Sequence, residues 1–161
     1  MVQIDIITED SRWSDTGLET LAQRALDAAF DALELDPNLE VSLLACDDSR
    51  MSALNADFRG KARPTNVLSW PAVDLSAESP GAFPSTPDQD ELELGDIAIA
   101  FETCQREAVD QDKPFGNHIS HLLVHGLLHL LGYDHENDPD AALMEGTERR
   151  ILAKLGIPDP Y

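Results

Sequence analysis

Four short segments of the chain have the apolar pattern of β-strands. Residues 2–8 (VQIDIIT) predict a first strand, and residues 39–46 (LEVSLLAC) alternate as a second strand would. Residues 65–71 (TNVLSWP) are bounded by a proline at each end, which favours an edge strand because proline cannot donate a ladder hydrogen bond. Residues 92–100 (LELGDIAIA) end in an apolar run, which indicates that the fourth strand is buried.

Five longer segments have helical periodicity. They are residues 17–33, 47–58, 101–112, 116–131 and 139–155. The last ends in KLGIP, where the glycine and the proline stop a helix. Residues 75–91 are rich in serine, proline and aspartate, which predicts a flexible acidic loop. Because no repeat or linker divides the chain, we expect residues 1–161 to form one α/β domain of four strands and about five helices.

The composition is that of a soluble globular protein, since 42% of the 161 residues are hydrophobic. The first ten residues, MVQIDIITED, lack the basic region and apolar core of a secretory signal, and no apolar run is long enough to span a membrane. Cys46 and Cys104 stand alone, without paired spacing. We therefore expect two reduced, packed thiols in a cytoplasmic protein that has no membrane partner.

The charge is strongly acidic but unevenly distributed. Eleven basic and 31 acidic residues give a formal net charge of -20, which argues against nonspecific affinity for nucleic acid. However, the segment FRGKARPTNVLSWPAV carries Arg59, Lys61 and Arg63 and contains no acid. It predicts one basic patch on an acidic body, and the alternative is a chance cluster on a solvated face.

The helix over residues 117–131 carries a stripe of histidines. At about 100° per residue, His118, His125 and His129 fall within roughly 40° of one another, and His121 lies about 40° beyond them. Leucine and valine occupy much of the remaining circumference, so the helix is expected to be buried and its imidazoles to face the protein interior. Gly126, beside the stripe, would let another backbone come close.

A third histidine follows a helix-ending glycine in HGLLHLLGYDH. A left-handed turn at Gly132 would bring His135 back against the face of His125 and His129, which completes a three-nitrogen metal site. The alternative is a hydrogen-bonded pair of core histidines and an unrelated surface histidine. Because three histidines and no cysteine leave a coordination position open, the spacing favours a catalytic metal over a structural one.

The spacing HxxxHxxGxxH is also that of the metzincin proteases. Those enzymes carry a glutamate where this chain has Gly126, and that glutamate takes the proton from the metal-bound water. The ligand pattern is therefore present without the general base for peptide hydrolysis. A metalloprotease-like hydrolase remains an alternative that Gly126 opposes.

Three separated motifs, HLLVHGLLHLLGYDH, FRGKARPTNVLSWP and LELGDIAIA, closely resemble the YbeY family of bacterial rRNA-maturation endoribonucleases. The resemblance implies a compact α/β fold with a small mixed sheet. It implies one metal ion per chain, usually taken to be Zn²⁺, bound by His125, His129 and His135. It also implies cleavage of single-stranded RNA rather than DNA, processing of small-subunit rRNA ends and a part in ribosome quality control. The expected partners are rRNA and the ribosome or its assembly proteins.

The resemblance also assigns residues around the metal. Arg59 matches the family's arginine and, with Lys61 and Arg63 nearby, could clamp an RNA phosphate. Asp96 matches the acid of the family's LGDI strand and could orient a histidine or accept a proton, or simply cap a helix or loop. His121 could assist a ligand histidine, shuttle a proton or be a satisfied core residue. A further alternative for the whole protein is a noncatalytic ribosome-assembly factor with a structural metal.

Overall fold

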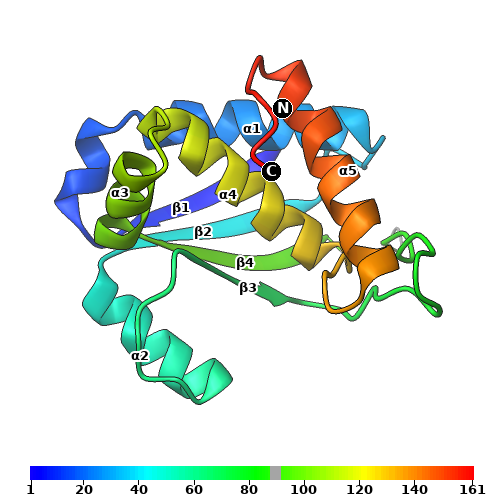
Figure 1. Ribbon diagram of the computed structural model, residues 1–161, viewed down its shortest axis with the longest axis horizontal. Helices are drawn as coiled ribbons and strands as arrows, with labels where there is room; N and C mark the ends of the chain where they lie inside the picture. The colour runs from blue at the N-terminus through cyan, green and yellow to red at the C-terminus, as the bar shows by residue number, and fades with distance from the viewer. Residues whose placement is uncertain (88–91) are drawn as a thin grey trace.

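Four strands form a single mixed sheet in the computed structural model, which describes residues 1–87 and 92–161. They are β1 (Gln3–Thr8), β2 (Glu40–Cys46), β3 (Val67–Pro71) and β4 (Glu93–Ala100). Their order is β1-β2-β4-β3, with β1, β2 and β4 parallel and β3 antiparallel to β4. The proline-bounded strand is therefore at the edge and the apolar β4 is internal, as predicted (Figure 1).

Five α-helices, all within the described ranges, connect and cover the strands close to the predicted positions. They are α1 (Leu18–Ala32), α2 (Asp48–Arg59), α3 (Phe101–Asp110), α4 (Phe115–Leu130) and α5 (Asp138–Lys154). Asn137 caps α5, because its side chain accepts a hydrogen bond from the backbone N–H of Asp140 at 2.9 Å. A short 3-10 helix, Ser11–Asp15, is not predicted by the pattern. Among the residues described, no helix combines the length and apolar character that crossing a membrane requires.

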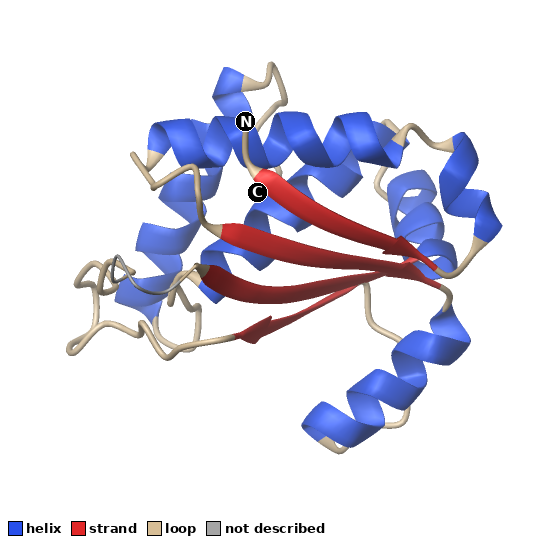
Figure 2. Ribbon diagram, turned by 180° about the vertical axis from the view of Figure 1, so that it is seen from behind, coloured by secondary structure: helices blue, strands red, loops and turns tan. Residues whose placement is uncertain are grey.

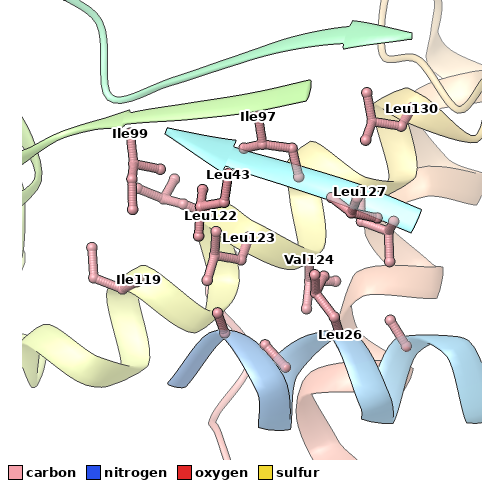
Figure 3. Close-up of a cluster of buried hydrophobic side chains, with 14 of the residues drawn as sticks. Leu26, Leu43, Ile97, Ile99, Ile119, Leu122, Leu123, Val124, Leu127 and Leu130 are labelled. Atoms are coloured by element: carbon pink, nitrogen blue, oxygen red, sulfur yellow. The ribbon is translucent and has the colours of Figure 1, made fainter. Parts of the chain in front are cut away.

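Helix α4 is packed between the sheet, α1 and α5 (Figure 1). Leu123, Val124 and Leu127 of α4 are fully buried, together with Ile97 of β4 and Leu26 of α1 (Figure 3). Burying one such side chain stabilises the fold by about 1.5–3 kcal/mol, so these contacts set the position of α4 firmly. The expected buried helix at the centre of a single compact domain is confirmed.

Among the helices of the described ranges, only α2 covers the opposite face of the sheet, and it meets α3 at its start, where Asp48 Oδ1 accepts a hydrogen bond from the backbone N–H of Thr103 (Figures 1 and 2). A smaller apolar cluster fills this side, formed by Cys46, Met51, Leu68, Ala98 and Ala100. Both cysteines are free and buried, as expected, and burial raises the pKa of the Cys46 thiol to about 12.

The segment between β3 and β4 contains no helix or strand in its described part, residues 72–87 and 92. Hydrogen bonds hold this part in place. For example, the backbone N–H of Ser85 donates to Leu75 O at 2.9 Å, and that of Gly81 donates to Asp140 Oδ1 at 2.8 Å. The rest of the predicted acidic loop, residues 88–91, lies outside the described residues.

Candidate metal centre

Helix α4 presents two histidines one turn apart. His125 and His129 share one face because they are four residues apart, and their Nε2 atoms lie 3.1 Å from each other. The Nδ1 of His129 lies 3.0 Å from the backbone oxygen of Tyr133. That contact makes Nδ1 the protonated nitrogen and leaves the Nε2 lone pair pointing towards His125.

The chain after α4 brings in the third histidine, as the sequence predicts. Gly132 adopts a left-handed conformation with φ of +99°, and a Cβ there would lie 2.5 Å from Leu75 O. Only glycine fits this turn. The ring of His135 consequently lies 5.2 Å from that of His129 and 5.6 Å from that of His125, measured between centroids.

These three histidines, here called the histidine trio, fit a divalent metal ion. One nitrogen from each of His125, His129 and His135 lies within 4.8 Å of the others. Burial, followed by the charges of His125 and His135, lowers the pKa of His129 to about 4, so its imidazole is neutral and able to ligate at neutral pH. His135 is exposed, which leaves one side of the trio open for water or substrate.

Gly126 lies on the side of α4 that faces the sheet. A Cβ there would lie 3.2 Å from Cγ2 of Ile97 and 3.2 Å from Oγ of Ser69. The Ser69 hydroxyl donates to the backbone oxygen of Gly126 at 3.2 Å. The close approach that we predicted at Gly126 therefore involves strand side chains and not another backbone.

The trio opens into a cleft of about 580 Å³ that Arg59 also lines. Arg59 is the last residue of α2, and Gly60 ends that helix in a left-handed conformation. Among the described residues that line the cleft, Arg59 is the only arginine or lysine. Lys61 and Arg63 line an adjoining groove that shares Arg59 with the cleft. The predicted basic patch is thus next to the trio, with Arg59 at the junction.

A sequence model of the family described as Endoribonuclease YbeY matches residues 3–156. The chain belongs to the YbeY family. A relative named endoribonuclease YbeY from Ruegeria pomeroyi is 60% identical over 162 residues, covering 98% of this chain and 97% of the relative. Another of that name, from Paracoccus denitrificans, is 57% identical over 158 residues, covering 98% and 89%. The family resemblance seen in three motifs is confirmed along nearly the whole chain.

The YbeY-family fold is also found in a solved structure, the solution structure of TM1509 from Thermotoga maritima. It matches with a TM-score of 0.58 and covers 96% of this chain and 92% of that one. Its sequence is 21% identical, so the likeness concerns the fold alone.

Asp96 does not join the trio in this YbeY-family chain. It is exposed on β4 and pairs with Ser42 and Trp70, and all three line a groove on the α2 side of the sheet. Its neighbour Ile97 points the other way and packs under α4. Because successive side chains of a strand point to opposite faces, our prediction that Asp96 orients a ligand histidine does not fit this position.

A buried carboxylate that the sequence reading missed contacts the trio instead. Glu148 of α5 is fully buried, and its Oε1 accepts a hydrogen bond from Nδ1 of His125. Its Oε2 lies 3.3 Å from Nε2 of His121 and accepts a hydrogen bond from the Tyr161 hydroxyl. Burial alone would raise the pKa of Glu148, but hydrogen bonds from His121 and His125 outweigh it and hold that pKa well below its ordinary value.

One sequence signal could have revealed Glu148. The buried residues of α5 follow helical spacing, and Met144, Ile151 and Leu152 are among them. Glu148 lies in the middle of this stripe, where a charge is costly unless it has partners. A carboxylate in an otherwise apolar helical stripe was therefore a reason to look for a polar partner on the neighbouring helix.

Proposed function

We propose that this chain is a metal-dependent endoribonuclease that cleaves single-stranded RNA in the cytoplasm. The observation that carries the proposal is that the histidine trio and Arg59 line one open cleft. The family membership supports RNA as the substrate, since the relatives are named endoribonucleases. The processing of small-subunit rRNA ends, a part in ribosome quality control and association with the ribosome or its assembly proteins belong to the same proposal.

The chain's own groups have distinct tasks in this reaction. His125, His129 and His135 would hold one Zn²⁺ ion, which when bound supplies positive charge to a phosphoryl oxygen and to an attacking water. Arg59 binds the anionic phosphate with two parallel N–H donors and so orients it towards the trio. Lys61 and Arg63 hold the neighbouring phosphates along the adjoining groove.

Two arguments set this activity above the alternatives. In metzincins the general base is a glutamate at the position of Gly126, and here that position has no side chain and faces the sheet. A purely structural ion has four protein ligands, whereas the trio offers three and is open to the cleft.

The test compares cleavage of four substrates: a labelled single-stranded RNA, the duplex form of that RNA, a DNA of the same sequence and an unstructured protein. The parent chain should cleave only the single-stranded RNA, lose that activity with a chelator and regain it with Zn²⁺. His129→Ala should lose both metal and cleavage but remain folded. His118→Gln is the matched control, because His118 is on α4 outside the trio, bonded to Glu107 at 2.9 Å. It should keep its metal.

Other outcomes would point elsewhere. Cleavage of the protein but not of RNA would establish the metalloprotease-like alternative. Metal-dependent folding with no cleavage of any substrate would establish the noncatalytic assembly factor. RNA cleavage by His129→Ala at the parent rate would show that the trio has no part in the reaction.

A further inference from the structure

We infer that Glu148 is a positioning residue that fixes the orientation and proton arrangement of His125 for metal binding, and that Tyr161 shields this contact from solvent. The inference rests on the metal site of the proposed function. It adds to that site a carboxylate on a different helix and a tyrosine that follows α5.

The two ring nitrogens of His125 face different partners. Nε2 points to His129 at 3.1 Å, within the trio, and Nδ1 contacts Oε1 of Glu148. A carboxylate accepts but cannot donate, so the proton of a neutral His125 is on Nδ1 and the lone pair is on Nε2. Glu148 thereby selects the form of His125 that can bind the ion. A negative partner also makes the imidazole a more basic ligand.

Hydrogen bonds account fully for the buried carboxylate. Glu148 is 0% exposed and takes no part in an arginine or lysine ion pair among the described residues. Three donors surround it instead, from His125, His121 and Tyr161. A carboxylate so placed is costly to bury, and packing α5 against α4 requires only apolar residues. The contact to His125 explains why a charge is present there.

Tyr161 covers the carboxylate from the solvent side. Its hydroxyl donates to Oε2 of Glu148, and burial, followed by that hydrogen bond, raises the pKa of Tyr161 above its ordinary value. Arg149 of α5 holds the segment in place: its Nε lies 2.9 Å from Oδ2 of Asp159, and its guanidinium lies 5.5 Å from the centre of the Tyr161 ring. The segment after α5 is thus docked over the contact between Glu148 and His125.

The test is the metal affinity of folded apoprotein, measured by Zn²⁺ competition with a chromophoric chelator. Glu148→Gln keeps the shape but removes the charge, and should weaken Zn²⁺ binding by about 10- to 100-fold. The visible absorption of the Co²⁺-loaded variant should also change, because the His125 ring is held less firmly. Glu148→Asp should restore part of the affinity. Tyr161→Phe keeps the ring over the carboxylate and should lower affinity less than Glu148→Gln.

The matched control is Glu107→Gln. Glu107 of α3 accepts a hydrogen bond from His118 of α4, so the chain offers a second carboxylate–histidine pair that joins α4 to a neighbouring helix and does not reach the trio. This variant should bind Zn²⁺ with the affinity of the parent chain, and its Co²⁺-loaded form should have the parent's visible spectrum. An equal loss of affinity in both glutamine variants would mean that loosening α4 is the cause, and the inference would be wrong.

The remaining outcomes separate this inference from the proposed function. Parent affinity in Glu148→Gln, with loss of metal in His125→Ala, would overturn the role of Glu148 and leave the trio intact. Metal retention in His125→Ala would overturn the trio itself. Two ions per parent chain, with one lost in Glu148→Gln, would make Glu148 a ligand and overturn its positioning role. If Glu148→Gln does not fold, parent affinity and spectrum in both Glu148→Asp and Tyr161→Phe would overturn the inference.

Discussion

The two faces of the sheet differ in what covers them and in what they can support. One face is packed against α1 and α4, and its residues Leu43, Ile97 and Ile99 are almost completely buried. On the other face, α2 is the only helix of the described ranges, and Ile7 is 57% exposed. A metal site needs ligands held in place by rigid packing. The covered face supplies that rigidity through α4, and the open face does not.

Strand β4 contributes neighbouring residues to both faces. Ile97 packs under α4 beside Gly126, while Asp96 lies in the groove on the α2 side. One position along the strand therefore separates a residue that supports the metal helix from one that does not. Closeness in sequence to a functional motif therefore does not place a side chain at the site.

The largest effect should come from a charge on the covered face. Gly126→Glu would place a carboxylate against Ile97 and Ser69 without a cationic partner, and should lower the free energy of unfolding by about 3–5 kcal/mol. Urea unfolding measures this. The variant should not become a protease. Gly146→Glu on α5 is the control, since nothing lies within 4 Å of a Cβ there. It should change the free energy of unfolding by no more than about 1 kcal/mol. Parent stability in Gly126→Glu would contradict the described packing.

The next largest effect is expected where α2 reaches the cleft, and it should change the rate of RNA cleavage but hardly change the stability of the fold. Arg59→Ala should slow RNA cleavage by about 10²–10³-fold, because a contact to developing charge is lost. The variant should keep its metal. Its free energy of unfolding should stay within about 1 kcal/mol of the parent's, since a cation at a helix end contributes no more than that. Arg59→Lys should recover part of the rate, because a point charge cannot replace a bidentate fork.

The adjoining groove offers the control for Arg59. Arg63→Ala should weaken RNA binding and reduce its logarithmic salt slope by about one phosphate contact, with little change in the cleavage rate at saturating RNA. If Arg59→Ala instead lost its metal or unfolded, Arg59 would be a structural residue and the cleft would lose its proposed phosphate clamp.

A smaller difference in stability is expected between alanine substitutions of two serines that lie on opposite faces of the sheet. Ser69→Ala removes the hydrogen bond to Gly126 O and should lower the free energy of unfolding by about 0.5–1.5 kcal/mol. Ser42→Ala, in the groove beside Asp96, should change it by less than about 0.5 kcal/mol, as is usual at positions without such contacts. Thermal and urea unfolding measure both variants, and equal losses would argue against any difference between the faces at these positions.

The smallest effect is expected at Asp96. Asp96→Asn should keep the parent's metal content and change the cleavage rate by less than about twofold, because an exposed substitution away from the site changes free energies by about 0.5 kcal/mol or less. Metal analysis and RNA cleavage measure the two properties. A tenfold slower reaction at full metal content would show that Asp96 takes part in the reaction and that the α2 side of the sheet contributes to it.

Local features of the sequence determined much of the fold and the core of the candidate site. Strand and helix periodicities predict the four strands and five α-helices of the described ranges, because burial on one face repeats with the backbone's own period. The same regularity places His125 and His129 on one face of α4, and Gly132 marks the turn that returns His135. All these relations span a few residues, so the covalent geometry of the chain sets them.

Which distant residues meet cannot be derived from local patterns in the sequence. Three features depend on how separate elements pack: the face of the sheet on which Asp96 lies, the contact between Glu148 and His125, and the position of Tyr161 over that contact. Arg59 reaches the cleft because α2 ends beside β3, far along the chain from the trio. No local period encodes such pairings: they follow from the minimum free energy of packing the whole core, in which each helix is placed by side chains outside its own segment.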